Sequence, residues 1–135
     1  MNEENTKAAA HAGSYGMKLL FTSPGIDGGE LADLIIGAVR SIGDEIGRRR
    51  KMLIGHVKVF ISVPGGSLQV NMVDLDLGPE KNDRLPADKI TEGEIRLMAA
   101  VVGLDDATLE QIIQNGLGPL RHKLEMDIMA HMHEH

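Results

Sequence analysis

The chain has 135 residues, with 14 Lys and Arg against 20 Asp and Glu, a net charge of −6, and no cysteine. This length suits one domain that buries about two-thirds of its unfolded surface, so folding requires neither a disulfide nor a metal. The missing cysteine excludes thiolate catalysis and cysteine-bound zinc or iron–sulfur centres. The negative net charge argues against nucleic-acid binding, and so does the small number of aromatic residues, which are two Phe, one Tyr and no Trp.

No apolar run approaches the roughly 18 residues of a membrane-spanning helix. Residues 1–16 are small and polar, without the apolar segment of a secretory signal. We therefore expect a soluble, cytoplasmic protein with no membrane attachment. Residues 1–16 are expected to form a disordered tail, and residues 17–135 a single α+β domain.

A short apolar run over residues 17–22 predicts a strand that ends at Ser23-Pro24-Gly25. A helix is expected from about Asp27 to Arg50, because aliphatic residues recur there at spacings of three and four. This stripe comprises Leu31, Ile35, Ala38, Ile42 and Ile46. Gly43 and Gly47, one turn apart, would either allow another segment to approach closely or mark a break in the helix.

The clearest pattern is the alternation of apolar and polar residues on both sides of Pro64-Gly65-Gly66. It predicts a β-hairpin over residues 56–72 with one apolar face that packs against helices. That face comprises Val57, Val59, Ile61, Val63, Leu68, Val70 and Met72. The apolar parity shifts by one residue at Val73, so either a β-bulge forms there or the strand leaves the sheet near Asp74.

The C-terminal half is expected to be helical. Residues 78–90, rich in Pro, Gly and charge, predict a loop. Thr91 and Glu94 have the spacing of a capping box, which predicts a helix from Glu92 to about Val102. Two further helices are expected, one over about 106–115 and one from Pro119 with Leu120, Leu124 and Ile128 on one stripe. The expected fold is a three-stranded antiparallel or mixed sheet with helices on one face, in the order β-α-β-β-α-α-α.

The functional hypothesis rests on apolar residues expected outside the core. Phe60 falls on the outer face of the hairpin, where an exposed aromatic ring often marks an interface. Met72 lies nearby across the hairpin, and Met126 and Met129 add apolar surface to the expected last helix. These residues predict an interface with a second copy or another protein, and hence a binding or accessory domain.

One alternative is a metal-binding protein or small enzyme. His131, His133 and His135 could bind a divalent transition metal. Only His131 and His135 would share a helix face, metal sites usually need a third or fourth ligand, and a chain end frays, so a histidine-rich end without a metal is the simpler explanation. Asp74 and Asp76 could bind a hard cation, although acidic residues also discourage strand edges from aggregating. No catalytic residue and no other cofactor is predicted.

A second alternative is an anion or phosphate-ligand site in segment 22–29, which precedes a helix N-terminus. Its glycines would supply backbone N–H groups, and the cationic run at the end of the same helix would supply charge. The candidates are Gly25, Gly28, Gly29, Arg48, Arg49, Arg50 and Lys51. Glu30 and Asp33 place negative charge at this end, and cations at a helix C-terminus are favourable without any ligand.

Overall fold

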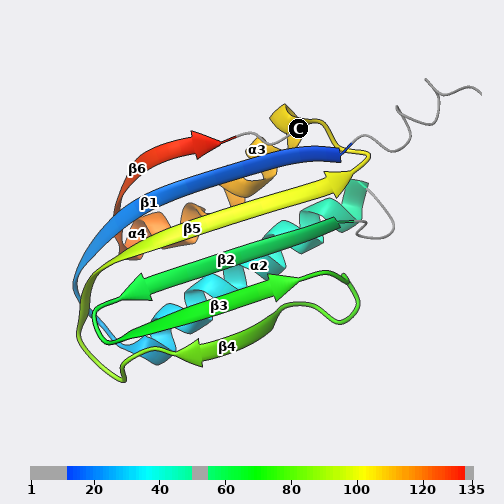
Figure 1. Ribbon diagram of the computed structural model, residues 1–135. Coiled ribbons are helices and arrows are strands. Elements are labelled where there is room, and N and C mark those ends of the chain that lie inside the picture. The colour runs from blue at the N-terminus through cyan, green and yellow to red at the C-terminus, as the bar shows by residue number, and fades with distance from the viewer. Residues whose placement is uncertain (1–11, 50–54, 133–135) are drawn as a thin grey trace, which may run out of the picture.

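The computed structural model describes residues 12–49 and 55–132, which form an antiparallel sheet with helices on one face (Figure 1). The strands are β1 (Ala12–Ile26), β2 (Gly55–Val63), β3 (Gly66–Met72), β4 (Glu80–Arg84), β5 (Ile90–Val102) and β6 (Glu125–Met132). The helices are α2 (Gly28–Arg49), α3 (Asp106–Gly116) and α4 (Gly118–Lys123). The six strands lie in the order β4-β3-β2-β5-β1-β6. The α+β class with an antiparallel sheet is confirmed, whereas the three-stranded sheet and the order β-α-β-β-α-α-α are wrong.

The predicted hairpin and long helix form the centre of the core. In the hairpin of β2 and β3, Val59 lies opposite Val70, and Ile61 lies opposite Leu68. All seven apolar residues on its inner face are buried, and so is the aliphatic stripe of α2. The alternation in the hairpin and the spacing of three and four residues in α2 therefore each correspond to a buried face, and these two faces pack against each other.

The structure shows whether α2 breaks at Gly43 and whether the strand bulges or ends near Val73. Helix α2 runs through Gly43 without a break. A Cβ added at Gly43 would lie 2.8 Å from Sδ of Met72, so the missing side chain allows a close approach. Strand β3 ends at Met72, and Val73 is 60% exposed, so the chain leaves the sheet at the point where the parity shifts.

Residues 90–102 form strand β5 and not the expected helix. β5 pairs with β1 on one side and with β2 on the other, so its backbone groups are satisfied between two neighbours. Its buried residues Ile95, Leu97, Ala99 and Val101 alternate with more exposed ones. The capping-box spacing at Thr91 describes local chain preference only, and the long-range pairing of a central strand overrides it.

The expected last helix is also wrong beyond its first turns. Helix α4 ends at Lys123, and Leu124 already has extended backbone angles, φ −129° and ψ 142°. The chain then continues as β6, which pairs with the otherwise free edge of β1. Segment 78–90 likewise contains a strand, β4, on the other edge of the sheet. Helix α3 is confirmed, with Asp105 accepting a hydrogen bond of 2.7 Å from the backbone N–H of Thr108.

Residues 12–16, which were expected in the tail, form the first part of β1, where Tyr15 is buried. Residues 1–11 lie outside the described part of the chain. No helix among the described residues is both long enough and apolar enough to cross a membrane.

Candidate functional site

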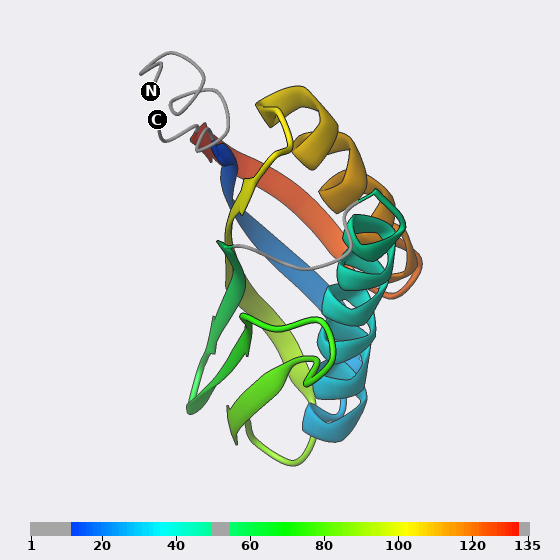
Figure 2. The same cartoon turned by 90° about the vertical axis from the view of Figure 1, so that its right-hand side faces the viewer.

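The face of the sheet opposite the helices is not covered by any described element (Figure 2). Because side chains alternate along a strand, every second residue of β1, β2 and β5 points to this side. We call these residues the open face: Lys18, Leu20 and Thr22 of β1, Lys58, Phe60 and Ser62 of β2, and Glu92, Glu94, Arg96 and Met98 of β5. Three large apolar side chains of this face are exposed, Leu20 at 44%, Phe60 at 43% and Met98 at 38%.

The strand register places these side chains around a charged centre. Phe60 lies opposite Arg96, and Arg96 lies opposite Lys18, so one aromatic ring and two cations form a row across three strands. Met98 lies two residues from Arg96 along β5 on one side of this row, and Leu20 lies two residues from Lys18 along β1 on the other side. The open face therefore combines the residue types, aromatic, Met and Arg, that are enriched in protein interfaces.

Glu94 holds the cations of this row in place. Its carboxylate lies 2.7 Å from Nε of Arg96 and 3.3 Å from Nζ of Lys18. The hydrogen bond from Arg96, followed by the one from Lys18, lowers the pKa of Glu94 below its ordinary value. Glu94 is therefore a carboxylate at neutral pH, and it fixes the position of Arg96 beside Phe60.

The structure brings only part of the predicted interface to this face. Phe60 points outward as expected. Met72 is 2% exposed and packs on the opposite, helical side of the sheet. Met126 lies in β6, is partly buried and contacts the core, while Met129 belongs to the same strand and its side chain lies outside the described part. An interface on a last helix is excluded, because that segment is a strand.

Leu20 and Met98 were missed for different reasons. The alternation in the first strand is enough to place Leu20 opposite to Leu19 and Phe21, so its outward direction could have been found. Met98 cannot be assigned to this face from a sequence that predicts its segment to be a helix.

The proposed anion site is not assembled. The N–H of Gly28 donates to the carbonyl of Ala87 at 3.0 Å, and a Cβ on Gly28 would lie 2.0 Å from the carbonyl oxygen of Pro86. The start of α2 is therefore packed against the loop before β5. Gly25 has φ +138° near the end of β1, where the register with β5 shifts, and Gly29 has no atom within 4 Å of an added Cβ.

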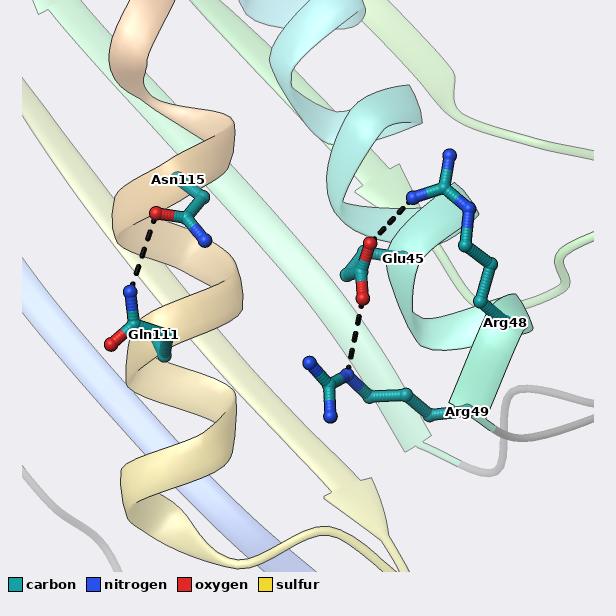
Figure 3. A network of polar contacts seen from close by, with 5 residues as sticks. All are labelled: Glu45, Arg48, Arg49, Gln111 and Asn115. Atoms are coloured by element: carbon teal, nitrogen blue, oxygen red, sulfur yellow. Dashed lines mark hydrogen bonds and ion pairs between the residues drawn. The ribbon is translucent and has the colours of Figure 1, made fainter.

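The cationic run lies at the other end of the same helix. At 1.5 Å per residue, the length of α2 separates the two groups by roughly 30 Å. Arg48 and Arg49 both pair with Glu45 one turn earlier, as Figure 3 shows. Arg50 and Lys51 lie outside the described residues. These arginines therefore have partners within their own helix and do not reach segment 22–29.

Residues 22–24 instead line a cavity of about 460 Å³ together with Arg121, His122 and Lys123. Two of these side chains already have partners. Arg121 donates to the backbone and side chain of Gln114, and Nζ of Lys123 lies 3.7 Å from Glu30. This arrangement offers no converging set of donors for an anion.

The metal hypothesis finds no support in the described residues, which contain no group of three His, Asp or Glu side chains placed to hold an ion. His131 belongs to β6, while His133 and His135 lie outside the described part of the chain. The Asp74 carboxylate accepts hydrogen bonds from the backbone N–H groups of Asp76 and Leu77, at 2.8 and 3.2 Å. Asp74 thus shapes a turn.

Comparison with protein-family models, with curated proteins and with solved structures finds no match, so the function has to be inferred from the geometry of this chain.

Proposed function

We propose that the chain is a self-associating binding domain whose open face packs against the open face of a second copy. The observation that carries this proposal is the exposed row of Phe60 and Arg96 at the centre of an uncovered sheet face. An antiparallel sheet can expose one face to water, but that face is then usually polar. Here Leu20, Phe60 and Met98 interrupt the polar pattern.

The symmetry of the sheet favours a second copy as the partner. β2 and β5 are the two central strands of the six, so an axis between them and parallel to them divides the sheet into equal halves. A two-fold rotation about such an axis, in the plane between two facing sheets, exchanges the two halves. Since Phe60 and Arg96 are register partners, each Phe60 would face Arg96 of the second copy.

This arrangement avoids like charges at its centre. Lys58 would face Met98 of the second copy, and Ser62 would face Glu94. The two Phe60–Arg96 contacts are cation–π pairs, worth about 0.5–2 kcal/mol each depending on desolvation. The twist of aligned packed sheets, about 30°, separates the outer strands and keeps the central row in contact.

The size of the face predicts the strength of the association. The four inner strands lie about 4.8 Å apart, and the central pair β2 and β5 is in register over eight residues, so the part of the face that stays in contact measures roughly 500 Å². A standard stable interface buries about 800 Å² per partner. We therefore expect a reversible dimer with micromolar to millimolar affinity, and not an obligate one.

Sedimentation equilibrium of the full chain, over a concentration series, tests the proposal. The wild type should dimerise with increasing concentration, and Phe60→Asp should raise the dissociation constant at least about 30-fold, the equivalent of about 2 kcal/mol. Val73→Asp is the matched control, because Val73 is more exposed than Phe60 but lies beyond the end of β3. Its dissociation constant should equal that of the wild type.

A wild type that stays monomeric up to about 1 mM would exclude the proposal. Equal effects of Phe60→Asp and Val73→Asp would show that the chain associates through some other surface.

A further inference from the structure

A second site lies on the helical side of the sheet. A cavity of about 540 Å³ opens between α2 and the loop that connects β3 to β4. In Figure 2 this loop curls away from the sheet towards α2. Arg40, Asp44 and Arg48 line the cavity from the helix, and Asp76 and Leu77 line it from the loop, while Met72 and Leu75 supply its apolar part. The volume is in the range of small-molecule sites.

Local features of the sequence create this space. Asp74 accepts two backbone hydrogen bonds, and Gly78 adopts φ +72°, so residues 74–78 form a tight turn. This turn places Leu75 beside α2. Gly47 has no side chain there, and a Cβ added to it would lie 3.5 Å from Cδ1 of Leu75. A larger residue at position 47 would occupy the cavity.

The charged side chains of the cavity carry both signs. Arg40, Asp44 and Arg48 are four residues apart, so they follow one face of the helix. Arg48 is already paired with Glu45. The side chains of Arg40, Asp44 and Asp76 make no salt bridge with any other residue that the structure describes. One cation and two carboxylates are thus available beside apolar surface.

We infer that this cavity binds a small zwitterion that carries an aliphatic group, of the class of free aliphatic amino acids. A carboxylate of such a ligand would pair with Arg40, and an ammonium group with Asp44 or Asp76. The aliphatic group would cover Leu75 and Leu77, and Leu77 is 73% exposed. An anionic ligand would pair with Arg40 but lie close to the carboxylates of Asp44 and Asp76, and a cationic ligand would leave Arg40 unpaired.

The first experiment compares three related probes: L-leucine, N-acetyl-L-leucine, which lacks the ammonium group, and L-leucinamide, which lacks the carboxylate. Binding to the full chain is followed by the amide NMR signals of Gly43, Gly47 and Gly78, which belong to the cavity wall. L-Leucine should bind at least about tenfold more tightly than either analogue, since each lost charge removes a charge-assisted contact. Glycine, which lacks the aliphatic group, should bind more weakly than L-leucine.

The second experiment fills the cavity. Gly47→Leu should abolish the saturable shifts caused by L-leucine. Gly37→Leu is the matched control, because Gly37 lies in the same helix and an added Cβ there meets no atom within 4 Å. This control should bind L-leucine as the wild type does. Arg40→Gln provides an independent variant and should reduce the affinity for L-leucine to that for L-leucinamide.

The inference is overturned by any of three results: no saturable shifts with L-leucine at about 10 mM, equal affinities for the three probes, or wild-type binding by both Gly47→Leu and Arg40→Gln.

Discussion

Gly93→Ala tests the strand assignment of residues 90–102 directly. Gly93 lies directly opposite Phe21 in the register of β1 and β5. A Cβ added there would lie 2.5 and 2.7 Å from two ring carbons of Phe21, and 2.8 Å from Cγ1 of Val63. Phe21 is 1% exposed and Val63 8%, so neither side chain can move into solvent without exposing apolar surface.

The expected cost follows from two opposing terms. Overpacking a close-packed core destabilises by about 1–3 kcal/mol. Replacing glycine in a strand recovers about 0.5–1 kcal/mol of conformational entropy. We therefore expect Gly93→Ala to lower the free energy of unfolding by about 1–2 kcal/mol, which corresponds to a fall of about 3–8 °C in Tm for a domain of this size.

Urea unfolding followed by circular dichroism measures this difference. If residues 92–102 formed a helix, the same substitution would stabilise the protein by about 1 kcal/mol, so the two assignments predict opposite signs. Gly37→Ala, in an exposed position of α2 with no nearby atom, should stabilise by about 0.5–1 kcal/mol and serves as the control. A neutral or stabilising Gly93→Ala would refute the packing of Phe21 over this glycine.

Two further predictions concern the faces of the sheet. Met72→Ala should lower the free energy of unfolding by about 2–5 kcal/mol, because Met72 is buried under α2, whereas Phe60→Ala should cost less than about 1 kcal/mol in the monomer. Equal costs in urea unfolding would contradict the assignment of inner and outer faces. The pKa of Glu94 is lower in the folded state than in the unfolded state. The ionised Glu94 side chain therefore contributes fully to stability above the ordinary glutamate pKa of about 4.3, and this contribution is lost as the pH falls through the pKa of Glu94 in the folded state. The difference in urea midpoint between wild type and Glu94→Gln should therefore be constant near neutral pH and shrink below about pH 4. A difference that grows on acidification would contradict the ion pairs of Glu94 with Arg96 and Lys18.

The hairpin and α2 could be predicted because their patterns are local and unambiguous. Alternation from Val57 to Met72 and the three-and-four spacing from Leu31 to Ile46 each determine a buried face without reference to the rest of the chain. The shift of parity at Val73 was also visible, but the choice between a bulge and the end of the strand depends on where Leu75 packs.

The strands β5 and β6 could not be predicted in this way, because their stability comes from partners far away in the sequence. Ile95, Leu97, Ala99 and Val101 alternate, yet Thr91 and Glu94 also fit a helix start. Only the pairing of β5 with β1 and β2 decides between them. The spacing of Leu120, Leu124 and Ile128 fits a helix stripe equally well, but the free edge of β1 takes the last segment as a strand.

The candidate sites show the same division. Phe60 could be placed on the outer face from the hairpin alone, but Arg96 became its neighbour only through the pairing of β2 with β5. The cavity combines Arg40 of α2 with Asp76 of the β3–β4 loop, and no local pattern relates these residues. The sequence therefore does not predict the role of a charged side chain when that role depends on a neighbour from another helix or strand.

The two proposed sites lie on opposite sides of one sheet, and this separation makes them compatible. A second copy packed on Phe60 and Arg96 would approach the side of the sheet that bears no described helix, whereas the cavity opens between α2 and the β3–β4 loop. Met72 lines the cavity and is buried, together with its register partner Val57, on the helical face, so the backbone of the sheet separates the cavity from the open face. Association through the open face would therefore leave the cavity accessible, and a dimer would present two independent ligand sites on its outer surfaces.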